Sequence, residues 1–276
     1  MPNLEVPRVL TAAAIEKRGV DAIGSEFHAH IPSWASGSIS AYDDRFLAGL
    51  ANYASPRKMV EIGVASGWSS TVLLKALNGS ENIRKVVGID LSPTYYLDSS
   101  IPTGRVVNEV VPELLSNYEL LTGRLAFDAM GDVGPIDFAF IDGHHMHPWA
   151  TIDLLSVLPF IERGRWIAMH DLNLCTFERH RHMNRAPFYL FYMWPDQKLH
   201  STQVPTMIGA ILLERNPVDY LPTILEILYT PWEVDVDPND LSRLARYIGS
   251  HFGDQWSQKF ADAFSKCRER FHAGKV

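Results

Sequence analysis

One short stretch, residues 60–70, decides the fold, and it reads VEIGVASGWSS. An apolar strand leads into a turn of small residues, and a helix is predicted to begin at about Ser69. Small side chains let the backbone of such a turn approach a ligand closely, and the free N–H groups of the following helix lie beside the polar atoms of that ligand. The stretch therefore predicts a strand, a ligand-binding turn and a helix in sequence.

Two acids indicate which ligand this turn would bind. Glu61 stands near the end of the predicted strand, where its carboxylate would repel the phosphates of a dinucleotide and attract the ammonium group of an amino acid. The next strand ends at Asp90, 23 residues beyond Gly67. An acid at that place accepts hydrogen bonds from ribose hydroxyls. The pattern predicts a nucleoside ligand with an amino-acid end, and a purely structural tight turn is the alternative.

Short β-rich apolar runs recur on both sides of this stretch, and helix-length segments separate most of them. The runs are residues 59–64, 86–89, 136–141, 166–169 and 208–213. Continuous apolar strands that alternate with helices are typical of a mostly parallel sheet covered on both faces. We therefore predict an α/β fold with a doubly wound sheet, preceded by a helix over residues 40–53 that Ser40 caps.

Composition divides the chain into three parts. We predict an N-terminal helical and loop cap over residues 1–57, a catalytic domain over residues 58–215 and a C-terminal helical extension over residues 216–276. Residues 24–37 form a loop that either covers a site or crosses the surface. The extension contains predicted helices over residues 220–229 and 241–271, with Gly249 and Gly253 as weak points in the second.

The overall composition excludes several classes of protein. The 276 residues are 46% hydrophobic and 21% charged, with 25 basic against 32 acidic side chains and a net charge of -7. These values are typical of a soluble globular domain and argue against a broad nucleic-acid surface or a membrane protein. Two distant cysteines, Cys175 and Cys267, and no apolar leader among the first twenty residues favour a cytoplasmic protein.

At this point the sequence resembles the class I S-adenosylmethionine-dependent methyltransferases. Glu61, Gly63 and Gly67 match their first motif, Ala65 replaces its usual middle glycine, and Asp90 matches the ribose acid. The resemblance extends over residues 40–215. It also places the adenine near the third strand, at residues 120–125, although Arg124 stands where members often carry an acid. The implied cofactor-binding residues are Glu61, Gly63, Ala65, Ser66, Gly67, Ser69, Asp90, Gly123, Arg124 and Asp142.

Two later strands end in polar clusters, FIDGHHMH at residues 140–147 and IAMHDLN at residues 167–173. Ligands of open parallel sheets bind beyond the carboxyl ends of the strands, so these clusters should converge on the reactive end of the cofactor. The pattern is similar to the small-molecule O-methyltransferase branch related to macrocin O-methyltransferase and cephalosporin hydroxylase-like proteins. These enzymes are commonly magnesium dependent.

The resemblance implies roles for the individual side chains. His145 matches the position of the general base, and His170 is the second candidate catalytic residue. Asp142 and Asp171, with His170, are the candidate metal ligands, and Mg²⁺ is the expected metal. His144 and His170 stand where members often carry an acid, so a transition metal, or histidine chemistry without a metal, stays open.

Histidines and aromatic residues concentrate in this half of the chain. Six of the eleven histidines lie between residues 144 and 182. We interpret His147 as a helix-entry or surface residue, and His180 and His182 as part of a solvated loop that could close over the site. The run FYLFYMW at residues 188–194 predicts a buried strand or a subunit contact, or a wall for an apolar acceptor together with Trp34.

The sequence thus predicts a methyltransferase that acts on a hydroxyl of a small molecule, for example a specialised metabolite, and that forms a homodimer. Three alternatives remain. The cofactor could react at another carbon, by cyclisation or aminocarboxypropyl transfer, and release methylthioadenosine. The histidine cluster could instead belong to a metal-dependent oxygenase or hydrolase, or the chain could be a noncatalytic binding subunit.

Overall fold

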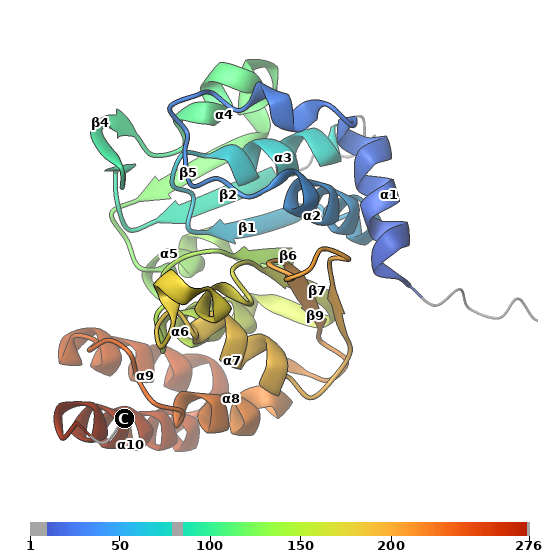
Figure 1. Cartoon of the computed structure of the whole chain (residues 1–276). Helices are drawn as coiled ribbons and strands as arrows, with labels where there is room; N and C mark the ends of the chain where they lie inside the picture. The colour runs from blue at the N-terminus through green and yellow to red at the C-terminus, as the bar shows by residue number, and fades with distance from the viewer. Residues whose placement is uncertain (1–9, 79–84, 275–276) are drawn as a thin grey trace, which may run out of the picture.

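A seven-stranded sheet forms the centre of the computed structural model, which describes residues 10–78 and 85–274 (Figure 1). The first nine residues of the predicted cap therefore lie outside the described part. The strand order is β5(Tyr118–Thr122), β2(Lys85–Asp90), β1(Lys58–Ile62), β6(Ile136–Ile141), β7(Ile161–Met169), β9(Gly209–Leu212) and β8(Lys198–His200). Neighbours from β5 to β7 pair in parallel, whereas β9 runs antiparallel to both β7 and β8. The predicted doubly wound α/β fold is confirmed.

Helices cover both faces of the sheet (Figure 1). One layer holds α1(Ala12–Ile23), α2(Ala41–Ala54), α3(Trp68–Leu77) and α4(Arg105–Val110). The other holds α5(Ala126–Val133), α6(Trp149–Val157), α7(Ala186–Met193), α8(Leu221–Leu228), α9(Pro238–Phe252) and α10(Asp254–His272). A small hairpin, β3(Thr94–Tyr95) and β4(Asp98–Pro102), follows β2. Short 3-10 helices complete the chain: η1(Phe27–His30), η2(Pro112–Asn117), η3(Leu158–Phe160), η4(Leu174–Thr176), η5(Glu178–His180) and η6(Pro217–Tyr220).

The central strands show why continuous apolar runs fold this way. In β6, Phe138 and Phe140 pack against the layer that contains α3, while Ala139 and Ile141 pack against the layer that contains α6. Successive side chains of a strand point to opposite faces, so a strand covered on both faces needs apolar residues throughout. Each fully buried phenylalanine contributes about 1.5–3 kcal/mol of hydrophobic stabilisation. This packing fixes the sheet whose edge carries the site.

The structure also revises details of the predicted elements. Residues 186–193 form helix α7, so the expectation of a buried strand in the aromatic run is wrong; Pro187 at the start of the helix suits its first turn. The predicted 241–271 helix is two helices, because Gly253 has φ +96° and ends α9. Ser40 caps α2 as expected, through a reciprocal capping box with Asp43.

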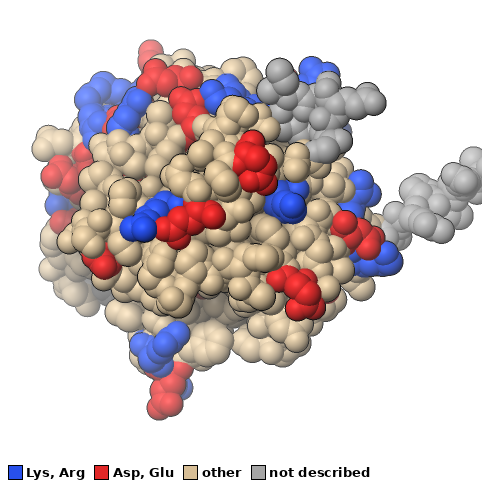
Figure 2. Space-filling view, turned by 90° about the horizontal axis from the view of Figure 1, so that it is seen from above, with Lys and Arg blue, Asp and Glu red and all other residues tan. Residues whose placement is uncertain are grey.

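The outer surface mixes charges of both signs. The face seen in Figure 2 is largely uncharged, with acidic and basic side chains interspersed on it. That face therefore carries no broad field of one sign. Among the described helices, none combines the length and the apolar character that crossing a membrane requires.

Candidate active site

The turn after β1 requires glycine at two positions. Gly63 has φ +87°, and a Cβ atom there would lie 2.2 Å from the backbone oxygen of Asp142. Gly67 has φ +93°, and its Cβ would lie 2.8 Å from the Cα of Gly104. Ala65 also adopts a positive φ, of 48°. The missing side chain of Gly63 lets the turn pack directly against the loop after β6, so the predicted cofactor turn and Asp142 are neighbours.

Asp90 connects the end of β2 to the same turn. Its Oδ2 accepts hydrogen bonds from the backbone N–H groups of Val64 and Ala65, both at 2.9 Å, and its Oδ1 accepts one from Ser92 at 2.8 Å. An ionised carboxylate offers about four acceptor sites, so one remains for a ribose hydroxyl. Asp90 thus holds the turn in shape and has capacity left for a ligand.

Glu61 lies fully buried behind the turn rather than on its surface. The hydroxyls of Ser69 and Ser70 donate hydrogen bonds to its two carboxylate oxygens. Burial raises the pKa of Glu61 to about 8, with a smaller contribution from Asp142 and Asp90, although the two serine hydrogen bonds lower it. Glu61 therefore retains a proton near neutral pH unless a cation approaches.

The remaining predicted cofactor residues lie around this turn, with one exception. Gly123 donates its backbone N–H to the carbonyl of Asp90 at 3.0 Å, so the end of β5 reaches the predicted ribose-binding acid. The hydroxyl of Ser66 lies 3.3 Å from that of Ser38, which brings the N-terminal loop onto the turn. Arg124, however, turns toward α5, where its guanidinium donates to Asp132 at 2.6 Å.

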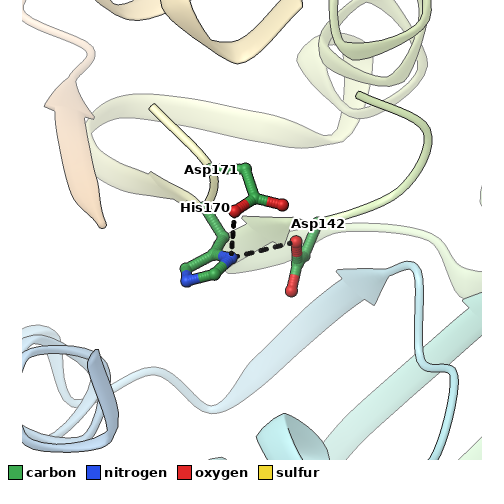
Figure 3. Close-up of side chains that lie close together, drawn as sticks. All are labelled: Asp142, His170 and Asp171. Atoms are coloured by element: carbon green, nitrogen blue, oxygen red, sulfur yellow. Dashed lines mark ion pairs between the residues drawn. The ribbon is translucent and has the colours of Figure 1, made fainter. Parts of the chain in front are cut away.

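A compact cluster of imidazoles and carboxylates occupies the ends of β6 and β7. Figure 3 shows His170 with its Nδ1 facing both Asp142 and Asp171, and the distances to Oδ1 are 3.5 and 3.4 Å. His145 approaches the same two acids, with Nε2 at 3.0 Å from Asp171 Oδ2 and 3.5 Å from Asp142 Oδ1. That buried Nε2 makes no hydrogen bond with the described residues, since its contacts are ion-pair contacts only. The structure thus brings together all the predicted catalytic and metal-binding residues.

The charges in this cluster shift one another's ionisation. Burial alone would lower the pKa of His170, but the neighbouring Asp171 and Asp142 raise it well above 6.5. The same balance raises the pKa of His145, where burial is opposed by Asp142 and Asp171. Burial would raise the pKa of Asp171, yet His170 and His145 lower it to about 2. Without a cation, the positive charge of the His170 imidazole therefore balances the acids.

Three other histidines make contacts of their own. His147 is buried, burial lowers its pKa to about 4, and its Nε2 lies 3.1 Å from the hydroxyl of Thr230. It is therefore a core residue just before the start of α6, which agrees with our helix-entry interpretation and not with a surface position. His144 is exposed and accepts the backbone N–H of Met146 at 3.2 Å. His180 lies 3.0 Å from Asn184.

The aromatic helix α7 lies beside the end of β7. Asn173 donates to the hydroxyl of Tyr192 at 3.0 Å, and the ring of Tyr192 is 43% exposed. Trp34 lies in the N-terminal loop, where its indole N–H donates to Glu109 at 3.1 Å. Trp34 therefore contacts α4, whereas the contact with Asn173 places Tyr192 of α7 next to the polar cluster.

Sequence reasoning missed two buried acids that contact this region. Asp43 of α2 lies 3.3 Å from Nε2 of His170. Glu233, between α8 and α9, accepts the backbone N–H groups of His147 at 2.8 Å and Arg185 at 2.9 Å, and so holds the loop that carries His145. Neither acid belongs to a motif, and the spacing of Asp43 from Ser40 signals only a capping box.

Comparisons with known proteins agree with this geometry. Residues 60–172 match a family model described as a methyltransferase domain. No curated protein matches the chain.

Three of the similar solved structures contain a bound cofactor or cofactor product. Cofactor-bound Rv0187 from MTB is 18% identical with a TM-score of 0.49, and the match covers 74% of this chain and 90% of that one. The O-methyltransferase TomG from Streptomyces achromogenes, in complex with SAM, is 16% identical with a TM-score of 0.47, covering 71% and 89%. An O-methyltransferase from Bacillus cereus, in complex with SAH, is 19% identical with a TM-score of 0.46, covering 75% and 93%.

The family match spans the glycine turn, Asp90 and the cluster that includes Asp142 and Asp171. The strand order places these residues along one edge of the sheet. The part of the chain that carries this site, residues 60–172, thus matches the methyltransferase domain family.

Proposed function

We propose that this chain transfers the methyl group of S-adenosylmethionine to a hydroxyl of a small-molecule acceptor, with His145 as the general base. One observation carries the proposal: the buried Nε2 of His145 lies 3.0 Å from Asp171 and 3.5 Å from Asp142 without a hydrogen bond. No described residue uses the hydrogen-bonding capacity of this nitrogen. It also lies on the loop that packs against the cofactor turn at Gly63.

The reaction requires that the acceptor oxygen is aligned with the methyl carbon and that the acceptor hydroxyl loses its proton. The acceptor hydroxyl gives its proton to His145 Nε2, the oxygen forms a bond to the methyl carbon, and the C–S bond breaks with its electron pair on sulfur. The products are the methyl ether, S-adenosylhomocysteine and the protonated imidazole. Alignment of the two reactants supplies about 7–11 kcal/mol in favourable intramolecular models, and a positioned base contributes about 10²- to 10⁴-fold.

The acids that surround His145 suit this role. Asp142 and Asp171 raise its pKa against the opposing effect of burial, and so strengthen it as a base. They also stabilise the imidazolium that forms when the proton arrives. His145 therefore combines a free nitrogen with nearby negative charge.

A divalent cation fits the residues at the ends of β6 and β7. Asp142, His170 and Asp171 each offer one ligand atom, and these atoms lie within 4.8 Å of one another. Two carboxylates with one imidazole suit Mg²⁺, which the resemblance implies, less well than Mn²⁺ or Fe²⁺. When bound, such an ion would polarise an acceptor hydroxyl and fix its direction.

The cofactor would occupy the edge formed by β1, β2 and β5. We propose that its ribose binds Asp90 and that its ammonium group lies toward the acid-rich side formed by Glu61 and Asp142. Gly123, next to Asp90, would border the adenosine. The contact between Arg124 and Asp132 favours a structural role for Arg124 over an adenine contact.

The proposal also includes the cellular location, the type of acceptor and the oligomeric state of the protein. Cys175 and Cys267 are both free thiols, which suits a reducing cytoplasm. The exposed apolar side chains of Tyr192 and Met193 on α7 suit either an apolar acceptor, as in specialised metabolism, or a homodimer contact. Light scattering of the purified protein, with and without a Tyr192→Ser and Met193→Ser double substitution, separates the two.

Product analysis tests the proposed reaction. The purified protein is incubated with S-adenosylmethionine and a panel of small phenols and alcohols, after chelation and after addition of Mg²⁺ or Mn²⁺. We expect S-adenosylhomocysteine and a methylated acceptor by mass spectrometry. Methylthioadenosine in its place would assign cyclisation or aminocarboxypropyl transfer. No binding of S-adenosylmethionine by calorimetry, together with stoichiometric copurified iron or zinc, would favour an oxygenase or hydrolase.

A further inference from the structure

Asp43 is a buried acid with two different neighbours. It is the third residue of α2, where its Oδ2 accepts the backbone N–H of Ser40 at 3.0 Å and the Ser40 hydroxyl at 2.6 Å. These contacts complete the capping box of the helix. The same Oδ2 lies 3.3 Å from Nε2 of His170. Asp43 therefore connects the start of α2 to the cluster at the end of β7.

Helix capping alone does not account for a charged residue at this position. The carboxylate is only 2% exposed, and its Oδ1 is buried without a hydrogen-bond partner among the described residues. Leaving a buried acceptor unsatisfied costs about 1–3 kcal/mol. A neutral side chain could accept the Ser40 N–H without burying a charge. The charge of Asp43 is therefore matched to its other neighbour, His170.

The imidazole of His170 is held from both sides. Its Nδ1 faces Asp142 and Asp171, and in Figure 3 its second ring nitrogen points away from both of these carboxylates. That second nitrogen is the one that meets Asp43. A carboxylate that accepts the N–H of one ring nitrogen fixes both the tautomer and the direction of the other. A ring with a carboxylate at each nitrogen has little freedom to rotate.

We propose that Asp43 is a positioning residue, which accepts the Nε2–H of His170 and thereby keeps Nδ1 directed at the space between Asp142 and Asp171. The inference rests on the proposed function, because it concerns the residues proposed to hold a divalent cation. Loss of such an outer partner lowers metal affinity or activity by about 10- to 100-fold in other proteins. We expect a loss in that range here.

The neighbouring acid of α2 provides a matched control. Asp44 is as buried as Asp43 and also meets a histidine, with Oδ2 at 2.6 Å from Nδ1 of His28, while its Oδ1 accepts the indole N–H of Trp68 at 2.9 Å. None of its recorded contacts reaches His170. Asp43→Asn and Asp44→Asn are isosteric changes that each remove one buried charge from the same helix turn.

Two measurements on the full-length protein test the proposal. The first is the Nε2–H proton of His170 in protein carrying ¹⁵N-labelled histidine, assigned through its loss in His170→Gln. The second is the dissociation constant for Mn²⁺ alone, from electron paramagnetic resonance of the free ion. We expect Asp43→Asn to shift the proton resonance upfield and to raise the Mn²⁺ dissociation constant about 10- to 100-fold. Asp44→Asn should leave both values unchanged.

Other outcomes overturn the inference. An unshifted His170 proton in a folded Asp43→Asn protein would mean that Asp43 does not accept it. Equal shifts in the two variants would mean that Asp43 acts only through the stability of α2. If the parent protein binds no Mn²⁺, the proposal that a divalent cation binds at this site is wrong. The proton resonance alone still decides the role of Asp43. The two failures are therefore distinguishable.

Discussion

The two halves of the sheet edge are built on different physical principles. At the ends of β1 and β2 the polar groups satisfy one another: Glu61 accepts from Ser69 and Ser70, and Asp90 accepts from the backbone of the turn. At the ends of β6 and β7 the side chains instead face each other as charges, with separations of 3.0–3.5 Å and an unbonded nitrogen on His145.

In our proposal, this difference separates the part that binds the cofactor from the part that carries out the chemistry. A turn whose backbone and acids are internally bonded presents a fixed shape before any ligand arrives, which reduces the cost of ordering on binding. A cluster with an unbonded imidazole nitrogen and mutually shifted pKa values keeps groups in reserve for a proton or a cation. Variants of the two halves should therefore fail differently: one should lose binding, the other turnover.

The largest expected effect is on turnover, through His145→Ala. Loss of the base should reduce kcat about 10²- to 10⁴-fold, while the dissociation constant of S-adenosylmethionine changes little. Single-turnover kinetics and calorimetry measure the two quantities separately. His144→Ala is the control, because His144 is the adjacent exposed imidazole and its one recorded bond is to the backbone of Met146. Equal losses in both variants would remove the assignment of His145.

The next largest effect is expected for Gly63→Ala, in the turn after β1 that we propose binds the cofactor. The new Cβ would lie 2.2 Å from the backbone oxygen of Asp142, at a residue with φ +87°. A clash with backbone and a strained φ together should lower the free energy of unfolding by about 3 kcal/mol and abolish cofactor binding.

Gly131→Ala is the control for that variant. A Cβ at Gly131, within α5, meets no heavy atom within 4 Å. Alanine is favoured over glycine inside a helix by about 0.5–1 kcal/mol, so this variant should be as stable as the parent or more stable. Denaturant unfolding of the two variants measures the contrast. A Gly63→Ala protein that binds cofactor normally would refute the close approach of the turn to Asp142.

The same comparison explains what the sequence could and could not predict. The cofactor half is local: strand, turn and helix follow one another within residues 60–70, and only glycine suits φ +87° at Gly63, so the sequence itself carries the geometry. Apolar runs likewise predicted β6 at its observed bounds, Ile136–Ile141. Short-range patterns were enough wherever the contacts are short-range.

Short-range sequence patterns could not predict contacts between residues that are far apart in the chain. Asp43 meets His170 across 127 residues, and Glu233 holds the backbone of His147 across 86. No spacing rule connects residues so far apart. The strand alternative for the aromatic run around Tyr189 is wrong, because continuous apolar residues suit a buried strand and a buried helix equally well. In the structure the run forms α7, in which Leu190 and Phe191 are buried while Tyr192 and Met193 are exposed.

A smaller effect is expected from Asp90→Ala, which acts on binding. The variant removes the carboxylate that accepts from Val64 and Ala65 and, in our proposal, from the ribose. A hydrogen bond to a charged group contributes about 1.5–3 kcal/mol, so the cofactor's dissociation constant should rise about 10- to 100-fold. Calorimetry measures it, with Asp21→Ala as a control at an exposed acid of α1. If kcat at saturating cofactor fell more than affinity did, the separation between the two halves would not hold.

The smallest expected effect is on the pH dependence of the protein's stability, and it comes from Glu61. Burial raises its pKa to about 8 in the folded protein, above the ordinary 4.5, so the folded state holds this proton more tightly than the unfolded state does. Between these two values the stability of the cofactor-free protein should fall as the pH rises, by at most about 1.4 kcal/mol per pH unit from this group.

Glu61→Gln should flatten that slope relative to the parent, and urea unfolding at several pH values between about 5 and 8 measures the difference. Saturating S-adenosylmethionine should flatten it in the parent as well, because a nearby ammonium group favours the ionised carboxylate. Parallel slopes in parent and variant would mean that Glu61 is ionised even without ligand. The cofactor half would then share the unbalanced charge of the catalytic half, and the distinction between the two would lie in geometry alone.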